Sequence, residues 1–321
     1  MIDYERKHTP ARSASEGQPS LALLAGLLDE PVQHIDWIQG GFSATTCEVV
    51  MESGAEAVLK WRPPVDRHKL AMELACADFA NEHGVRTPEV IARGEHWMLM
   101  RRVNGVRVDT LLEDVSMRAH WEYVGRACAE VLVTLHDVSH YNVSGFLNPD
   151  MSICEELGGA GTGMVPHMLG WLDSPLMSTR LDRGVVCACR ALIHEQEAAW
   201  RWLDEDGARL VHSDFNTKNL MAEHVEGGGW RVTVLDWEYA FAGSRFMDVG
   251  NFMRFGEERP GVAQAFAQHY GTHARGVPGN WRELAYLCDL CSMLSMMMRP
   301  ELSARSLATV EGVVRMILSK F

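Results

Sequence analysis

A predicted β-hairpin lies inside a long helical stretch of this sequence and constrains the fold more than any other feature. Its strands are Leu220–Ala222 and Val232–Leu235, and the connecting residues 226–230 include three consecutive glycines. Glycine readily adopts the positive φ angles of tight hairpin turns. Apolar residues at helical spacing predict helices on both sides of the hairpin, over residues 116–136, 185–203, 262–273 and 284–298. The chain must therefore place a small hairpin against a helical body.

The first third of the sequence has the opposite balance. Short apolar segments bounded by turn residues predict strands over residues 47–51, 57–61 and 97–100. Helical spacing is restricted there to residues 21–28 and 67–83. We therefore predict an α+β chain of two lobes: a small β-rich N-lobe over 31–103 and a larger, mostly helical C-lobe over 104–321, after an N-terminal leader over 1–30.

Polar residues frame the hairpin at a regular spacing. His212, Asp214 and Asn219 form the pattern H-x-D-x-x-x-x-N before the first strand, and Asp236 follows the second strand. The hairpin should bring Asn219 and Asp236 to one end. An aspartate can orient a hydroxyl group and accept its proton, and amide and carboxylate oxygens suit Mg²⁺. The pattern predicts phosphoryl transfer.

The segment Val211–Gly250 resembles the catalytic core of the aminoglycoside phosphotransferase and choline kinase family, a branch of the protein-kinase-like fold. The resemblance implies that Asp214 is the catalytic base and that Asn219 and Asp236 bind magnesium. It also implies a structural role for His212 beside the catalytic loop, rather than a role as base or metal ligand.

Two departures from protein kinases accompany this resemblance. Asp236-Trp237-Glu238 stands in place of the usual D-F-G, and no A-P-E element follows, which argues against a protein substrate. Further on, Gly243–Gly250 is similar to the family's G-[DS]-P-x-x-D-[LI]-[AG] element, with Arg245 in place of proline, so the local turn is expected to differ. The resemblance implies that Asp248 supports the catalytic loop through backbone N–H groups. A helix N-cap is the alternative for Asp248.

A glycine-rich loop near the N-terminus is similar to the family's phosphate-binding loop. It contains Gly40, Gly41 and Ser43, with Ala44 where the family often has asparagine. Backbone N–H groups and a hydroxyl can surround a phosphate. A plain hairpin turn is the alternative.

The order strand, lysine, helix, glutamate also matches the nucleotide-binding half of the family. Lys60 ends a predicted strand, as the phosphate-binding lysine does in V-A-I-K, and Glu73 lies on the next helix, where it can pair with that lysine. The resemblance further implies a hinge that meets the nucleotide base, made of Met100, Arg101, Arg102 and Val103.

Net charge and hydropathy argue against nucleic acid and membranes as binding partners. The formal net charge is −13, which disfavours nucleic acid because phosphate backbones bind basic surfaces. No apolar run approaches the ~20 residues that span a bilayer, and residues 1–20 lack the apolar core of a signal peptide. We expect a cytoplasmic monomer or homodimer with no membrane partner.

Several other features are interpreted as structural. The eight cysteines predict reduced, buried thiols, and the Cys288/Cys291 pair has no second pair with which to bind zinc. Gly159–Gly163 follows no strand, so we interpret it as a flexible loop beside the acceptor site rather than a dinucleotide loop. His136 is expected simply to pack at the end of a core helix.

The resemblance implies transfer of a γ-phosphate from ATP or GTP, with Mg²⁺, to a hydroxyl of a small molecule. An aminoglycoside-like antibiotic is the first expectation for the acceptor, and choline, homoserine or a sugar is the alternative. A nucleotide-binding pseudokinase or scaffold is disfavoured by the intact set of site residues. The net charge, with Glu238 near Asp214, favours a cationic or polyhydroxylated acceptor; a neutral hydroxyl compound stays open.

Overall fold

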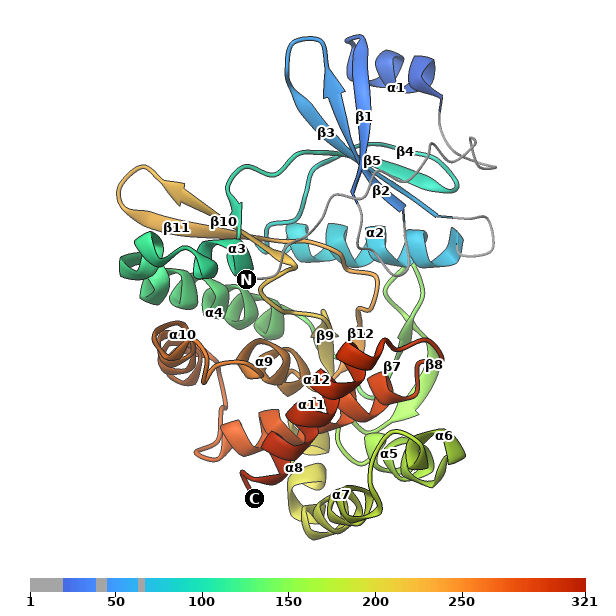
Figure 1. Ribbon diagram of the computed structural model, residues 1–321, viewed down its shortest axis with the longest axis vertical. Helices are drawn as coiled ribbons and strands as arrows, with labels where there is room; N and C mark the ends of the chain where they lie inside the picture. Colours follow the sequence, from blue (N-terminus) through green and yellow to red (C-terminus); the bar gives the residue numbers. More distant parts are fainter. Residues whose placement is uncertain (1–19, 39–44, 63–66) are drawn as a thin grey trace. The chain divides into compact units, whose positions relative to one another are not determined.

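A computed structural model describes residues 20–38, 45–62 and 67–321 of the chain (Figure 1). These residues divide into two compact units. Unit 1 comprises the described residues up to Ala71 and the segment Pro88–Val103. Unit 2 comprises Met72–Thr87 and Asn104–Phe321. The chain thus changes unit between Val103 and Asn104.

Among the described residues of unit 1, five strands form an antiparallel sheet in the order β1-β2-β3-β5-β4. Their bounds are Val32–Ile38 (β1), Thr45–Met51 (β2), Glu56–Trp61 (β3), Val90–Arg93 (β4) and Trp97–Arg101 (β5). Alternate residues of β2 and β3 are buried in a core with Leu24 of the short helix α1 (Leu21–Leu28). This alternation is what a sheet with one covered face requires.

Helices make up most of unit 2. They are α3 (Val108–Glu113), a 3₁₀ helix (Val115–His120), α4 (Trp121–Val138), α5 (Met164–Asp173), α6 (Pro175–Ser178), α7 (Arg183–Glu195), α8 (Glu197–Asp206), α9 (Phe246–Met253), α10 (Pro260–His273), α11 (Trp281–Met297) and α12 (Ala304–Leu318). The helix α2 (Arg67–Glu82) begins in unit 1 and continues in unit 2.

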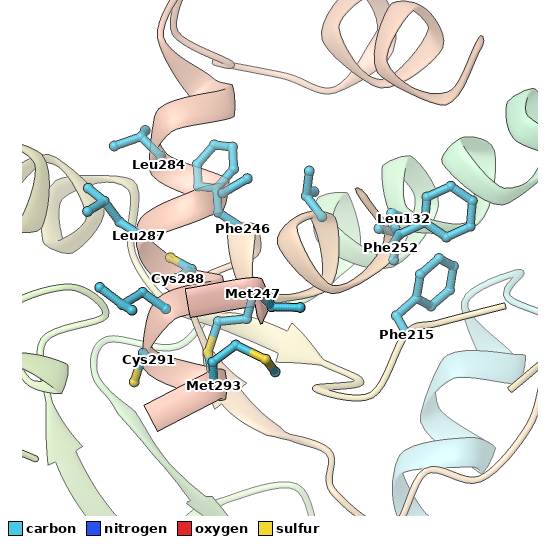
Figure 2. Close-up of a cluster of buried hydrophobic side chains, with 14 of the residues drawn as sticks. Leu132, Phe215, Phe246, Met247, Phe252, Leu284, Leu287, Cys288, Cys291 and Met293 are labelled. Atoms are coloured by element: carbon cyan, nitrogen blue, oxygen red, sulfur yellow. The ribbon is translucent and has the colours of Figure 1, made fainter. Parts of the chain in front are cut away.

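The centre of unit 2 is a core between α9 and α11 (Figure 2). Phe246 and Met247 of α9 meet Leu284 and Cys288 of α11 there. The helices approach closely because position 250 is glycine: a Cβ atom at that position would collide with the Ala285 carbonyl. The core fixes α9, which carries Asp248, firmly inside the unit.

Two small sheets interrupt the helices of unit 2. One has the order β11-β10-β6 and the other the order β8-β7-β12-β9. Their strands are β6 (Val106–Arg107), β7 (Ser144–Leu147), β8 (Ile153–Gly158), β9 (Arg209–Val211), β10 (Leu220–Val225), β11 (Gly229–Val234) and β12 (Phe241–Gly243). The predicted hairpin is β10 and β11, and it lies beside α3 and α4 (Figure 1). Residues 212–219 connect β9 to β10 and residues 235–240 connect β11 to β12, so both segments run between the two sheets.

The prediction of a β-rich first part and a helical second part is confirmed, but two predicted helices are wrong as single elements. The helix predicted over 116–136 is the 3₁₀ helix Val115–His120 followed by α4. The single helix predicted over 185–203 is two helices, α7 and α8, which are separated at Gln196 (φ −93°, ψ 25°). The break lets Trp200 turn into the core, where its indole N–H donates to the carbonyl of Ile193 at 2.9 Å. No glycine or proline marks this position.

The expectation that all cysteines are buried is wrong for two of them. All eight cysteines are free, but Cys154 and Cys187 are exposed rather than buried. Among the described residues, none of the helices combines the length and hydrophobicity that a bilayer crossing needs.

Candidate active site

A buried carboxylate holds the segment 212–219 in its conformation. Asp248 is fully buried on α9, and its two oxygens accept hydrogen bonds from the backbone N–H groups of His212 (2.9 Å) and Ser213 (2.7 Å). Ser213 has a φ of +64°, a left-handed conformation that is uncommon for residues other than glycine. Charge-assisted bonds to both peptides stabilise this conformation. Asp248 is not the N-cap of α9, since Arg245 occupies that position.

Asp214 follows directly and is held by two asparagines. Its Oδ1 accepts from Asn216 Nδ2 at 2.8 Å and its Oδ2 accepts from Asn219 Nδ2 at 2.7 Å. Burial raises the pKa of the Asp214 carboxyl above its ordinary range; His212, the Asn219 hydrogen bond and Arg254 oppose that shift, and the charge of Asp236 adds to it. An oriented carboxylate with increased proton affinity is suited to act as a base.

Asn216 is a site residue that the motif H-x-D-x-x-x-x-N does not identify. Its amide nitrogen donates to the carbonyl of Asp214 at 3.2 Å as well as to the carboxylate, and its Oδ1 accepts from Lys218 N at 2.9 Å. The only signal in the sequence was an asparagine two residues after the aspartate.

The structure brings Asn219 and Asp236 to the same end of the hairpin. Leu220 pairs with Val234 in the ladder, and the N–H of Leu235 donates to the carbonyl of Asn219 at 2.8 Å. Asp236 is half-buried with a φ of +61°. Because the Asn219 amide nitrogen is bonded to Asp214, its amide oxygen is the atom left for a cation.

The chemistry of this donor set fits a magnesium ion that is shared with a nucleotide. Within the described residues, no cluster of three or more His, Cys, Asp or Glu side chains forms a complete metal site. Mg²⁺ is commonly bound by one or two carboxylates together with substrate phosphates and water. The Asn219 amide oxygen and the Asp236 carboxylate supply protein ligands of that kind.

His212 links the two segments of the site. Its Nε2–H donates to the carbonyl of Leu235 at 2.8 Å, and its Nδ1 accepts from the N–H of Asp214 at 3.2 Å. The ring also packs edge-on against Trp237 at 4.9 Å. Both ring nitrogens are thus engaged by backbone groups, and neither is left for a metal or for proton transfer.

Lys60 and Glu73, predicted to bind nucleotide, are both buried, with exposed fractions of 6% and 3%. Lys60 lies on β3, between Thr46 of β2 and Met98 of β5. Long charged side chains are rarely buried unless they are paired. Lys60 belongs to unit 1 and Glu73 to unit 2, so a contact between them stays a prediction.

The predicted hinge covers the end of β5 and the change of unit. Met100 is half-buried. Arg101 is exposed and pairs with Glu89 at 2.8 Å. Arg102 forms ion pairs with Glu48 and, at 2.7 Å, with Glu56.

Val103 is the last residue of unit 1. The predicted phosphate-loop residues Gly40, Gly41 and Ser43 lie outside the described residues.

The possible acceptor residue Glu238 is half-buried, two positions after Asp236. Next to it, the ring of Tyr239 lies under the guanidinium of Arg299, 5.3 Å from its centroid. Arg299 belongs to the segment after α11, and this segment therefore borders the residues that follow Asp236.

The glycine-rich turn at 159–163 directly follows strand β8, so the expectation that it follows no strand is wrong. Side-chain contacts also hold this turn in place. Gly161 N and Thr162 N donate to Asp204 Oδ1 of α8 at 2.7 and 3.0 Å, and the Thr162 hydroxyl donates to Oδ2. A Cβ atom at position 161 would collide with the Trp200 carbonyl. The glycines allow the turn to pack closely against α8. The Asp204 carboxylate accepts from the backbone N–H groups that would bind a phosphate in a dinucleotide loop.

Arg245 ties the start of α9 to two distant segments. It is 3% exposed, and its guanidinium bonds Asp206 at 2.6 Å, the Arg275 carbonyl at 2.7 Å and the Gly276 carbonyl at 3.3 Å. Its φ of −54° lies in the range that proline adopts. The φ angle at this turn therefore needs no change from proline, and only the side-chain contacts differ.

His136 was expected only to pack, but it contacts the site. Its Nε2 lies 3.3 Å from Asp248 Oδ2, and its Nδ1 lies 3.2 Å from the Tyr270 hydroxyl. The residues of this contact are 112 positions apart in the sequence, and no local pattern announces it.

Comparison with known proteins identifies a family and a fold. Residues 35–287 match the model of the phosphotransferase enzyme family. No curated protein matches the chain in sequence.

Solved structures of similar fold cover nearly the whole chain. A thermostable mutant of aminoglycoside phosphotransferase APH(4)-Ia, in its apo form, has 17% identity and a TM-score of 0.64, with 94% of this chain and 99% of that chain covered. Macrolide 2'-phosphotransferase MphH from Brachybacterium faecium has 16% identity and a TM-score of 0.61, with 92% and 95% covered. A candidate fructosamine-3-kinase from Thermobifida fusca YX-ER1 has 17% identity and a TM-score of 0.60, with 92% and 98% covered. The predicted protein-kinase-like fold is confirmed.

Proposed function

The chain belongs to the phosphotransferase enzyme family, and we propose that this small-molecule phosphotransferase moves the γ-phosphate of ATP or GTP to a hydroxyl group in the presence of Mg²⁺. The observation that carries the proposal is the Asp214 carboxylate. It is oriented by Asn216 and Asn219, its pKa is raised mainly by burial, and it adjoins the Asn219–Asp236 end of the hairpin.

In this proposal each residue of the site has one task. Asp214 accepts the proton of the acceptor hydroxyl and orients its oxygen toward the phosphate. The Asn219 amide oxygen and the Asp236 carboxylate would hold Mg²⁺, which when bound neutralises the negative charge of the phosphates. Asp248 and His212 keep the two segments in register through their backbone contacts.

The nucleotide would be held mainly by residues of unit 1. We propose that Lys60 contacts the phosphates and that Glu73 positions Lys60. The glycine-rich loop would surround the phosphates with Gly40, Gly41 and Ser43, and the base would meet the hinge residues Met100, Arg101, Arg102 and Val103. A thermostable mutant of aminoglycoside phosphotransferase APH(4)-Ia, which has a similar fold, has been solved in a ternary complex with AMP-PNP and hygromycin B. That complex supports a nucleotide and a small molecule as the two ligands.

We propose an antibiotic as the acceptor, with an aminoglycoside-like compound first, because aminoglycoside and macrolide phosphotransferases are among the similar structures. Candidate fructosamine-3-kinases are also among them, which supports a metabolic hydroxyl compound as the second candidate. Glu238 lies close after Asp236 and is proposed to contact the acceptor.

A screen of ATP consumption tests the proposal. The purified chain is supplied with MgATP and, separately, with aminoglycosides, macrolides, fructosamines, choline, homoserine and simple sugars. One class should stimulate ATP consumption, and Asp214→Asn should lower the stimulated rate on the order of 10²-fold or more, the usual size of a general-base contribution. Nucleotide binding by Asp214→Asn should persist, because Asp214 is assigned to the acceptor. Equal rates for wild type and Asp214→Asn would remove Asp214 from the role of base.

A further inference from the structure

Three buried polar side chains form a hydrogen-bonded series that connects α4 and α10 to residues 212–219, the catalytic segment. It runs from the Tyr270 hydroxyl to His136 and from His136 to Asp248, with distances of 3.2 and 3.3 Å. The exposed fractions of the three residues are 0%, 3% and 0%. Asp248 in turn accepts hydrogen bonds from the backbone N–H groups of His212 and Ser213. The hydrogen-bonded series therefore ends on the two residues that precede Asp214.

Burial and the Asp248 carboxylate determine the protonation states of Tyr270 and His136. Burial lowers the pKa of His136 and raises the pKa of Tyr270, so the ring is neutral and the hydroxyl keeps its proton. A neutral imidazole has one N–H, and an ionised carboxylate can only accept. The N–H is therefore on Nε2 and donates to Asp248, while Nδ1 accepts from the Tyr270 hydroxyl.

The same turn of α4 also holds the strand that enters the catalytic segment. The His136 carbonyl accepts from Arg209 Nε at 3.1 Å, and the Ser139 hydroxyl accepts from Leu210 N at 2.8 Å. Arg209 and Leu210 lie on β9, which continues directly into residue 212. His136 is thus fixed to the entry strand by its backbone and to Asp248 by its side chain.

We propose that Tyr270 and His136 are positioning residues for phosphoryl transfer: the Tyr270 hydroxyl holds the His136 ring by donating to Nδ1, and His136 Nε2–H holds the Asp248 oxygen that accepts from His212. Packing alone accounts for the Tyr270 ring, which stacks parallel to Phe266 at 6.0 Å. Packing does not account for a hydroxyl group aimed at Nδ1 in a fully buried position. Only the kinetic consequence rests on the proposed function.

Tyr270→Phe tests the proposal because it removes the hydroxyl and keeps the ring. The probe is MgATP hydrolysis with water as acceptor, so no identified substrate is needed. The variant should lower kcat about tenfold, which corresponds to about 1.4 kcal/mol, near the size of one lost buried hydrogen bond. The KM for ATP should stay within about twofold, since the nucleotide contacts are assigned elsewhere. Tyr286→Phe, on the half-buried tyrosine of α11 that packs beside Lys320, is the matched control and should leave both constants unchanged.

Long-range ¹H–¹⁵N spectra of histidine-labelled protein give a readout that does not depend on activity. Wild type should show His136 with a protonated Nε2 and a bare Nδ1. Tyr270→Phe should keep this tautomer, because Asp248 still accepts from Nε2, and should shift the Nδ1 resonance because Nδ1 loses its hydrogen bond. Amide exchange at His212 and Ser213 should speed up in the variant.

Two outcomes overturn the proposal: a wild-type His136 that carries its proton on Nδ1, or a Tyr270→Phe variant with a shifted Nδ1 resonance and unchanged kcat. If Tyr270→Phe does not fold, the wild-type spectrum alone decides between the two tautomers. A wild type that never consumes ATP would refute the proposed function, while the spectra and the amide exchange would still test the positioning of the segment.

Discussion

At the scale of single residues, the site depends on keeping two carboxylates close in a half-buried place. The charge of Asp236 contributes to the raised pKa of Asp214. The Asn216 and Asn219 amides offset this repulsion by donating to the Asp214 oxygens. A cation between Asn219 and Asp236 would offset it further. Metal binding and proton affinity are therefore linked in this site.

Removing Asp236 should separate nucleotide binding from its dependence on metal. In Asp236→Ala, Mg²⁺ should no longer increase the affinity for ATP, and turnover should fall at least about 10²-fold, since a bound metal contributes several kcal/mol of charge stabilisation. Calorimetric titration with ATP, with and without Mg²⁺, measures this. Glu238→Ala, two residues further, should keep the magnesium effect. A magnesium effect that survives in Asp236→Ala would exclude this carboxylate as a ligand.

The pH dependence should carry the signature of the buried base. The pKa of Asp214 is raised above the ordinary value of about 3.9, and the reaction needs the carboxylate. The rate kcat/KM should therefore fall as the pH drops through this raised pKa, at a higher pH than an exposed aspartate would give.

The contribution of Asp214 to folding stability changes with pH in the opposite direction to its contribution to the rate. The folded chain binds the Asp214 proton more tightly than the unfolded chain, so this carboxyl favours folding fully below its unfolded pKa and loses that contribution as the pH rises through the folded pKa. A carboxyl NMR titration, assigned with Asp214→Asn, measures the raised pKa on which the rate and stability predictions both depend. An ordinary or lowered pKa at this carboxyl would contradict them.

At the scale of elements, the turn 159–163 and α8 form one structural unit through Asp204. In Asp204→Ala the N–H groups of Gly161 and Thr162 lose their acceptor. The free energy of unfolding should fall by about 1–3 kcal/mol, the cost of unsatisfied polar groups. Denaturant titration measures the loss. Glu205→Ala, at the exposed neighbouring position, is the control and should change it by less than about 0.5 kcal/mol; an equal loss in both variants would mean that the turn does not depend on Asp204.

Elements with strong local signals could be predicted from the sequence. The hairpin, with φ angles of +99° and +88° at Gly227 and Gly228, and the helix Leu21–Leu28 both lie where the pattern indicates. The break at Gln196 could not be predicted, because tertiary burial of Trp200 decides it. In the site, a motif identifies Asp214, whereas the contact of His136 joins segments far apart in the sequence.

At the scale of the whole molecule, the formal net charge of −13 should influence how an acceptor arrives. A negative field attracts cations, and its range shrinks to about 10 Å at 0.1 M salt. For a cationic acceptor, kcat/KM should therefore fall as salt increases, mainly through a higher KM. Steady-state kinetics with the best acceptor of the screen, at low and physiological ionic strength, measure the effect. A neutral best acceptor with salt-independent kcat/KM would reject the cationic acceptor and leave the kinase assignment intact.

The buried arginine at the start of α9 has an evolutionary consequence. Arg245 is the nearer cationic partner of Asp206, whose side chain is only 9% exposed, and Arg209 lies farther away at 3.9 Å. A single change of Arg245 to proline would therefore leave this buried carboxylate with the longer contact alone. Such intermediates cost several kcal/mol, and lineages rarely cross them one step at a time. Among descendants of a common ancestor, positions 245 and 206 are therefore expected to covary: chains with proline at 245 should carry a neutral residue at 206, and chains with arginine should keep the acid.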